Sequence, residues 1–570
     1  MRFLCLSLLL CGGVSAQTQL QQNYDSRNYN FVRTVGQGTS GSLSTSGAGK
    51  ILTLRPCPWG LSTSYAVRIV DGSASELATP TAVSCPGGAS SGTITISTVN
   101  SYSGSWSIRS ATAGIQEAIT TGGGNSMAVT VPAGSVNTYS SVVVTGNEVT
   151  IAGTGKGSRI APQFTTGSAF YFNGLGLGNA TGYRNTIRDL GIGFPTVGTA
   201  VMGVRINGQV QFLAKSVRIN NVNRGFSVEG QATTSIVRII ECEIEGLTPV
   251  TGIGIHQLGG ADVYINHNVI LGFYADQPHS GIRLDYSTGS KILENEVFAT
   301  GFGLYIGPGD GELVLGLESI SNWYDSGSED GIAIVPTGTG EARLIRSVAD
   351  WCSVFTRNGI EIGSSGVVNG VTFINPLSRD NTESGVLHNG GTNIEFIGAV
   401  VTGNSNTSAG TYHGITVASG IGRFKILGGV FGQTAGSPNT QGYGILVNGG
   451  ASDNYSIQGV TVTPNVTGGI ADGGTGLNRV VKDNIGSTNV MADLVAAGSL
   501  DIGTTAQEVF RISGTTQVTT ISRGWNGRTI ILIFTDASPG GVGTGGNIGR
   551  VQTAAQNQSI RLTFDGTAWY

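Results

Sequence analysis

Two carboxylates and a histidine occupy matching places in a phrase that this sequence repeats. Glu229, His256 and Asp285 each lie four residues after the glycine that opens their phrase. If the repeats stack as coils, Glu229 and Asp285 lie two strands apart, about 9.6 Å between backbones. Carboxylates roughly 6.5 to 9.5 Å apart fit an inverting glycosidase, one as acid and one as base. We therefore predict Glu229, Asp285 and His256 as catalytic residues.

A second row, two residues after each glycine, supplies groups that suit a sugar ligand. It reads Arg205, Ser227, Gly254, Arg283, Tyr305, Ala333, Glu361. An arginine binds a sugar carboxylate through its planar fork of donors, and tyrosine rings stack on sugar faces. We predict a substrate-binding set with these members: Arg205, Arg283, Tyr305, Tyr264 and Tyr274. The alternative is an ordinary solvated surface, where rows of mixed charge are the default.

A possible calcium row is less convincing. Glu243, Asn268 and Glu296 each precede an apolar position in neighbouring repeats. A Ca²⁺ cage needs roughly 6 to 8 oxygen ligands, and this row offers two carboxylates. We therefore predict no metal and no cofactor, and we interpret the recurring asparagines as hydrogen-bonded ladders at coil corners.

The phrase that carries these residues returns between Gly203 and Ile470. Successive phrases begin 22 to 30 residues apart, about 27 on average. A period of this size indicates a solenoid. The phrases are Gly203-Val-Arg-Ile206, Gly225-Phe-Ser-Val228, Gly252-Ile-Gly-Ile255, Gly281-Ile-Arg-Leu284, Gly303-Leu-Tyr-Ile306, Gly331-Ile-Ala-Ile334, Gly359-Ile-Glu-Ile362, Gly385-Val-Leu-His388, Gly414-Ile-Thr-Val417, Gly444-Ile-Leu-Val447 and Gly469-Ile470.

Each phrase alternates apolar and variable residues, as a strand with one inward face does. A second alternating run separates neighbouring phrases, for example Asp262-Val-Tyr-Ile-Asn-His-Asn-Val269. Two or three short strands per coil without helices predict an all-β fold, a right-handed parallel β-helix of about 11 to 13 coils over residues 111–486. A propeller is excluded because its blades need roughly 40 or more residues.

The first residues of the chain have the pattern of a targeting signal. Arg2, an apolar run to Cys11 and the small residues Val14-Ser-Ala16 predict a secretory signal peptide over residues 1–16. The apolar run is too short for a membrane span, so we expect a secreted protein. The polar, Gly/Ser/Thr-rich residues 17–50 predict a flexible leader.

Residues 51–110 predict a small β-sandwich-like domain of short strands. Cys57 and Cys85 are its only cysteines, and export implies an oxidising environment, so we predict a disulfide between them. Cys242 and Cys352 lie about four coils apart, which is roughly 19 Å and too far for pairing.

A short helix signal follows at Thr112-Ala-Gly-Ile-Gln-Glu-Ala-Ile119, with Thr112 as the expected N-cap. Such a helix would cover the open end of the solenoid. Together with Val129-Thr-Val-Pro-Ala-Gly134 and Val149-Thr-Ile-Ala-Gly-Thr-Gly155, it resembles the opening of pectate-lyase-superfamily proteins, a right-handed β-helix group that includes phage tailspike depolymerases. The likeness covers about Ala111 to Gly486. It implies the fold, and an activity among lyases, hydrolases, epimerase-like enzymes and non-catalytic adhesins.

Residues 487–570 leave the coil pattern and predict a C-terminal β-domain. Gly524-Trp-Asn-Gly-Arg-Thr-Ile-Ile-Leu-Ile-Phe534 and Phe564-Asp-Gly-Thr-Ala-Trp-Tyr570 resemble the C-terminal β-domain of phage tail spikes and fibres. That resemblance implies a cap on the solenoid and a homotrimer.

The charge composition argues against nucleic acid as a binding partner. The 35 acidic side chains nearly balance 31 basic ones, for a net charge of -4, so nothing suggests electrostatic nucleic-acid binding. Two functions remain open. The first is an exported polysaccharide-binding enzyme, a polysaccharide lyase or glycoside hydrolase acting on an acidic or acetylated glycan. The second is a non-catalytic surface, adhesin or tailspike-like protein that uses the solenoid as a rigid spacer.

Overall fold

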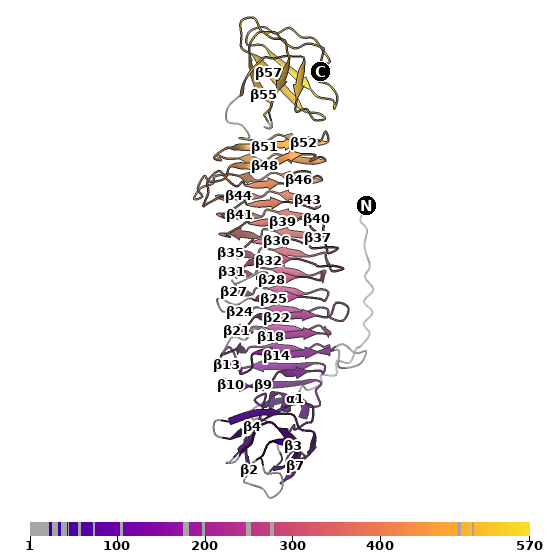
Figure 1. Ribbon diagram of the computed structural model, residues 1–570, viewed down its shortest axis with the longest axis vertical. Coiled ribbons are helices and arrows are strands. Elements are labelled where there is room, and N and C mark those ends of the chain that lie inside the picture. Colours follow the sequence, from indigo (N-terminus) through magenta and orange to yellow (C-terminus); the bar gives the residue numbers. More distant parts are fainter. Residues whose placement is uncertain are drawn as a thin grey trace, which may run out of the picture.

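The protein is a rod with a β-domain at each end of a long solenoid, as the computed structural model shows (Figure 1). The structure describes residues 22–25, 32–35, 43, 45–54, 57, 59–71, 74–102, 106–174, 182–195, 200–246, 252–273, 279–486, 492–503 and 507–570. The predicted signal peptide lies outside these residues. The prediction of a right-handed parallel β-helix of 11 to 13 coils is confirmed, with about 12 turns.

Three parallel sheets run the length of the solenoid. The glycine phrases form one of them, the glycine-phrase sheet. It consists of β11 (Val142–Val144), β14 (Thr166–Asn173), β18 (Ala200–Asn207), β22 (Arg224–Glu229), β25 (Ile253–Gln257), β28 (Ser280–Leu284), β32 (Phe302–Ile306), β36 (Ile332–Ile334), β39 (Ile360–Ile362), β42 (Val386–His388), β45 (Ile415–Val417), β48 (Tyr443–Gly450) and β51 (Gly468–Gly474).

The second sheet takes the strand that precedes each phrase. It consists of β10 (Gly134–Thr138), β13 (Ser158–Pro162), β17 (Gly191–Gly193), β21 (Arg218–Asn220), β24 (Glu243–Glu245), β27 (Val269–Leu271), β31 (Glu296–Phe298), β35 (Trp323–Asp325), β38 (Trp351–Ser353), β41 (Leu377–Arg379), β44 (Val400–Thr402), β47 (Val430–Phe431) and β50 (Thr461–Val462).

The third sheet takes the strand after each phrase, and the short pair β15 (Gly182–Tyr183) and β19 (Gln209–Val210) lies apart from it. It consists of β1 (Gln22–Asp25), β9 (Met127–Val131), β12 (Val149–Gly153), β16 (Thr186–Arg188), β20 (Leu213–Lys215), β23 (Arg238–Ile240), β26 (Tyr264–Asn266), β29 (Ser287–Thr288), β30 (Lys291–Leu293), β33 (Leu313–Leu315), β34 (Glu318–Ile320), β37 (Glu341–Val348), β40 (Val367–Ile374), β43 (Thr392–Ile397), β46 (Phe424–Leu427), β49 (Tyr455–Gln458) and β52 (Arg479–Lys482).

Glycine opens each phrase because the coil corner leaves no room for a side chain. A Cβ on Gly225 would lie 2.4 Å from Ile244 Cγ2 and 2.5 Å from the Gly254 carbonyl oxygen of the next coil. A Cβ on Gly254 would likewise lie 2.4 Å from Ile270 Cγ2. The glycine row therefore runs through Gly254, and the alignment that opened this phrase at Gly252 was wrong by two residues.

This correction moves His256 from the row of Glu229 and Asp285 to the row of Arg205 and Arg283. His256 pairs in register with Ser227 on one side and Arg283 on the other, so it belongs to the arginine row rather than beside Glu229 and Asp285. The phrase contains two glycines in alternation, Gly252 and Gly254, and either fits the sequence pattern. Only the packing against Ile270 selects the second.

Asparagines form the predicted ladder at a coil corner. Asn268, Asn295 and Asn322 are buried, and the side-chain oxygen of each next residue accepts a backbone and a side-chain N–H from the one before. Asp350 ends this run and accepts from Asn322 at 2.9 Å. The residue before each ladder asparagine has a positive φ, as His267 does at 54°.

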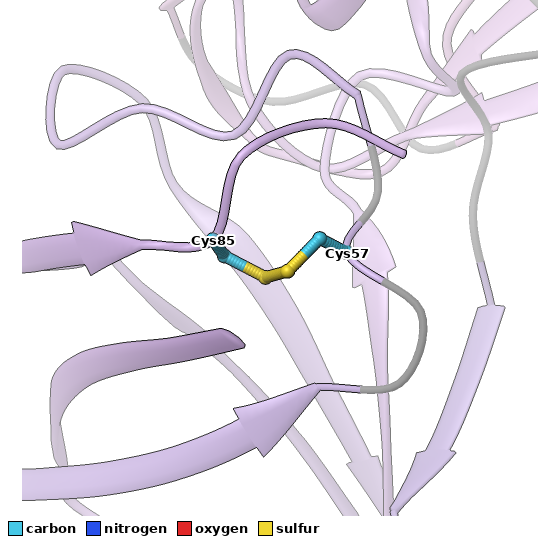
Figure 2. Close-up of a disulfide and its surroundings, with 2 residues drawn as sticks. All are labelled: Cys57 and Cys85. Carbon is cyan, nitrogen blue, oxygen red and sulfur yellow. A yellow bond between two sulfur atoms is a disulfide. The ribbon is translucent and has the colours of Figure 1, made fainter. Parts of the chain in front are cut away.

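The N-terminal domain packs two small antiparallel sheets around its own core. One contains β2 (Val32–Val35), β8 (Trp106–Ser110), β4 (Val67–Asp71) and β5 (Ala74–Ala78), and the other β3 (Gly47–Leu54), β7 (Gly92–Thr98) and β6 (Ala82–Ser84). The predicted disulfide between Cys57 and Cys85 is confirmed (Figure 2). Cys242 and Cys352 are free and buried. Within residues 17–50, β1 pairs with β9 and β2 with β8, which differs from a flexible leader.

The helix α1 (Ile115–Thr121) lies at the start of the solenoid, and its Ile115, Ala118 and Ile119 join the solenoid core. Its N-cap is Gly114, so the expectation of Thr112 as N-cap was wrong. Thr112 still contributes, because its hydroxyl accepts the Gln116 N–H and donates to Glu117. Within the described residues, no helix is long and apolar enough to cross a membrane.

The C-terminal domain has a separate core, and it contacts the last coil where the Asn526 backbone N–H donates to the Leu477 carbonyl oxygen. Its sheets contain β53 (Ala492–Val495), β55 (Val509–Ser513), β57 (Thr529–Phe534) and β58 (Ser559–Thr563), and β54 (Ser499–Asp501) with β56 (Thr520–Ser522). Trp525 belongs to this domain by sequence, but its side chain packs in the solenoid core. The guanidinium groups of Arg479 and Arg528 lie 4.9 and 4.0 Å from the centroid of its ring.

Candidate functional site

The outer face of the glycine-phrase sheet carries an unbroken row of polar and aromatic residues. Consecutive strands place these residues in register, from β14 to β32. We call them the site row: Tyr171, Arg205, Ser227, His256, Arg283 and Tyr305. Six of the eight predicted site residues, Glu229 and Asp285 included, come together on this face.

Arg205 and Glu229 form one half of the site. Arg205 Nε donates to both carboxylate oxygens of Glu229 at 3.0 Å, and Nη2 donates at 2.8 Å. The Ser227 hydroxyl donates to Glu229 at 2.9 Å. The Arg205 guanidinium lies 4.5 Å from the Tyr171 ring centroid. Glu229 is therefore held on both oxygens, as a bidentate pair requires.

Arg283, Asp285 and His256 form the other half. Arg283 Nε donates to Asp285 Oδ1 at 2.8 Å, and His256 Nε2 lies 2.7 Å from Asp285 Oδ2. Arg283 lies 5.1 Å from the Tyr305 ring centroid. The two halves thus repeat one arrangement, in which an arginine joins a carboxylate to a tyrosine ring.

The electrostatics of this half favour an ionised aspartate and a neutral histidine. Burial raises the pKa of Asp285, but the hydrogen bonds from His256 and Arg283 outweigh it, and the pKa lies below its ordinary value. Burial lowers the pKa of His256, and the hydrogen bond to Asp285 only partly opposes this. Neutral His256 then donates from Nε2, which leaves Nδ1 as an acceptor that is buried and without a hydrogen-bond partner.

The predicted carboxylates are less open to solvent than the repeat pattern suggests. Asp285 is 6% exposed and His256 is 4% exposed. Arginine side chains cover outward positions with their stems while keeping their charged ends near water. Arg205, Arg283 and Tyr305 are partly exposed and are the groups that a ligand meets first.

The remaining predicted tyrosines do not join the site row. Tyr264 lies on β26 in the third sheet, where the Arg238 guanidinium lies 5.7 Å from its ring centroid. Tyr264 does not lie beside Glu229 and Asp285 as expected, because its segment forms β26, and the strands of the third sheet follow the glycine phrases along the chain. Tyr274 lies outside the described residues.

The possible calcium row does not form a cage. Glu243 and Glu296 lie on the second sheet with Val269 between them, and Asn268 points inward in the asparagine ladder. Lys156 Nζ lies 2.6 Å from Glu243. No cluster of ligating side chains that could hold a metal occurs among the residues that the structure describes.

Two site residues escaped the sequence analysis. Tyr171 belongs to an early coil, Ala169-Phe-Tyr-Phe172, that lacks the opening glycine. Arg224 stands just before the glycine of its phrase, so a row counted from that glycine omits it. Its Nη1 lies 3.4 Å from Ser227 Oγ, which puts its guanidinium beside the site row.

A second charged cluster lies further along the same sheet. Arg357 contacts Glu329 and Asp330 at 3.2 Å and Glu361 at 3.0 Å. Burial, and then the neighbouring Glu361, raise the pKa of the fully buried Asp330 well above its ordinary value. Asn358 donates to Asp330 from its backbone and its side chain. One arginine thus joins three carboxyl groups of which one favours its protonated form.

Comparison with known proteins gives likenesses in structure only. No protein family and no curated protein matches the chain. Among solved structures, the A-module of mannuronan C-5 epimerase AlgE6 from Azotobacter vinelandii is 15% identical with a TM-score of 0.41, over 66% of this chain and 96% of that one. The tailspike of Escherichia coli bacteriophage HK620, in complex with a hexasaccharide, is 12% identical with a TM-score of 0.44, over 63% and 72%. Gene product 12 of bacteriophage phi29 is 14% identical with a TM-score of 0.45, over 76% and 64%.

The coil architecture places the chain in a fold class. Three parallel sheets, a buried asparagine ladder and a helix at the first coil are all present. The chain has the fold of a right-handed parallel β-helix.

Proposed function

We propose that this is an exported polysaccharide-binding protein whose ligand lies along the site row. The observation that carries the proposal is the unbroken register of two arginines, each against a tyrosine ring, on one outer face. Guanidinium groups and aromatic rings supply the hydrogen bonds and stacking surfaces that sugar rings need. Parallel coils space these groups evenly, about 4.8 Å per strand, along the axis that an extended glycan would follow.

A binding experiment with a matched control tests this. Full-length protein is titrated with a panel of polysaccharides in a calorimeter, and Arg283→Ala with Tyr305→Ala is compared with Arg238→Ala with Tyr264→Ala. Both double variants remove an arginine stacked near a tyrosine, but the second pair lies on another sheet. We expect at least a tenfold loss only for the first. Equal affinities for the two variants would contradict the proposal.

Cleavage is a second candidate function, and the His256–Asp285 pair favours elimination over hydrolysis. A glycosidase acid needs a raised pKa, whereas that of Asp285 is lowered, and Glu229 is held by Arg205 and Ser227. Neutral His256 has the protonation state of a general base, and ligand binding would have to uncover its buried acceptor Nδ1. Such a base would take the proton from the carbon next to a sugar carboxylate as the C–O bond at the β carbon breaks. A C=C bond forms between these two carbons, which gives an unsaturated uronate, and the departing sugar oxygen takes a proton from water.

Product analysis separates these chemistries. Unsaturated uronates and reducing ends are assayed for wild type, His256→Gln, and Glu229→Gln with Asp285→Asn. We expect unsaturated products from wild type and none from His256→Gln, which retains glycan binding. Saturated reducing ends alone would indicate hydrolysis, and the absence of any product would leave the tailspike-like or adhesin function.

The proposal also includes export of the protein and its assembly into a homotrimer. The disulfide supports an oxidising compartment, and residues 1–16 supply the expected signal. The C-terminal domain exposes Val495, Val551 and Tyr570, at 73, 64 and 54%, and we propose that a homotrimer formed through this domain buries them. Light scattering of the full chain should then give three times the monomer mass, and the monomer mass would contradict the trimer.

A further inference from the structure

Arg224 is the arginine of this face that has no carboxylate partner. Arg205 is paired with Glu229 and Arg283 with Asp285. Arg224 makes no ion pair with any residue that the structure describes, and its one hydrogen bond, to Ser227, is long at 3.4 Å. Three guanidinium groups therefore face two carboxylates, and one positive charge is in excess.

Leaving that charge unpaired is costly in the fold. Arg224 is partly buried, and burial lowers its pKa although Glu229 lies near enough to oppose the shift. An arginine offers five N–H donors, and a partly desolvated guanidinium that uses one of them poorly is destabilising. None of its nitrogens is sealed from solvent without a partner, so its free donors are accessible.

The neighbours of Arg224 limit which ligand group could pair with its guanidinium. Its guanidinium lies beside the middle of the site row, between the two arginine–carboxylate pairs, and both its nearest carboxylates already serve other arginines. His256 is neutral in this setting and adds no charge. A ligand with one planar anionic group would match the fork and cancel the excess charge.

We propose that Arg224 binds the carboxylate of a uronic acid, so that the ligand of the site row is an acidic polysaccharide. This inference rests on the proposed function, and it names the substrate class. Arg224 is the residue that decides between a uronate and the corresponding neutral sugar. Arg205 and Arg283 hold the protein's own carboxylates with part of their N–H donors and offer the remaining donors, beside the tyrosine rings, to the uncharged groups of the glycan.

The test uses full-length protein with matched acidic and neutral glycans. Polygalacturonate, alginate and hyaluronan are each titrated beside the carboxyl-reduced form of the same polymer, which has the same length but no charge. Wild type is compared with Arg224→Gln, Arg224→Lys and the control Arg238→Gln. Thermal melting confirms that each variant is folded before it is titrated.

We expect wild type to bind at least one uronan and to bind its reduced form about 10- to 100-fold more weakly, the range of one charge-assisted contact. Arg224→Gln should lose the same factor for the uronan and none for the reduced form. Arg224→Lys should recover part of it, because the charge remains without the fork. Arg238→Gln should behave as wild type.

Three results overturn the inference. Arg224→Gln that binds the uronan as wild type does would remove the role of this residue. Binding of the reduced form as tightly as the uronan would show a neutral ligand, and the proposed function would survive. Binding of no glycan at all, acidic or neutral, would reject the proposed function together with the inference.

Discussion

Single side chains on this rod differ in how fully their polar atoms are satisfied. Asp285 and Glu229 are each held on both oxygens, whereas His388 is fully buried with neither ring nitrogen hydrogen-bonded. It packs edge-on against Phe424 at 5.7 Å. A buried histidine without partners must stay neutral, so its protonation opposes folding.

His388 should make the solenoid labile in acid. Burial lowers the pKa of His388 from 6.5 to about 4, so stability is full above pH 6.5 and is lost as the pH falls toward 4. The shift corresponds to about 3 kcal/mol. Replacing His388 with Leu should remove that part of the pH dependence, measured as free energy of unfolding in urea at pH 4 and pH 8.

The exposed His267 provides the control for this measurement. His267→Asn keeps a residue that tolerates the positive φ of that position and should leave the contribution of His388 in place. An acid lability that is the same in His388→Leu as in wild type would assign the effect to other groups.

Asp285→Asn is expected to weaken the fold as well as any activity. It leaves Arg283, of which 20% of the side chain is exposed, without its carboxylate. Because the pair is mostly buried, the loss should be about 2 kcal/mol. Chemical denaturation would measure it, and a change below about 0.5 kcal/mol would mean that solvent screens the pair.

At the scale of elements, the strands of the coils could be predicted from sequence, whereas the register of β25 could not. Alternation and the recurring glycine identify the strands of each coil, because one face must enter the core. The row of His256 depends on whether Gly252 or Gly254 meets Ile270, a contact between coils that the phrase itself does not encode. The register that brings Arg205 beside Glu229 follows from the phrases at Gly203 and Gly225, but the ion pair itself depends on side-chain conformations that the phrases do not encode, so the site looked more open in sequence than it is.

Removing one asparagine side chain from the ladder should markedly lower the free energy of unfolding. Asn295 accepts two hydrogen bonds from Asn268 and donates to Ile265 and Asn322. Asn295→Ala leaves buried donors unpaired and should lower the free energy of unfolding by about 3 kcal/mol. The exposed Asn406 is the control, and equal losses for both alanine variants would argue against the ladder.

For the whole molecule, three hydrophobic cores predict separate unfolding events. The N-terminal domain, the solenoid and the C-terminal domain each bury their own cluster. Cys57 and Cys85 enclose 28 residues of the first domain, and loop closure of that length contributes about 3.5 kcal/mol. In calorimetry, replacing both with serine should lower only the transition of the N-terminal domain. A matching shift of the solenoid transition would show that the two unfold together.

Trp525 couples the C-terminal domain to the solenoid. It is 4% exposed and lies in the solenoid core although its neighbours in sequence belong to the next domain. Trp525→Ala should therefore destabilise the last coil by about 3 to 5 kcal/mol. Amide exchange should accelerate in β51 and β52 and stay slow in β25 and β28, and uniform protection would contradict the coupling.

The direction of the backbone hydrogen bonds has a mechanical consequence. In a singly wound solenoid these bonds point along the rod, from each coil to the next. Tension applied between the two ends would load them one coil at a time, as in a zipper, whereas sideways force would be shared by a whole strand. Such a rod would stay stiff when bent or compressed yet release length stepwise when stretched, which a single-molecule pulling trace would record as a regular sawtooth.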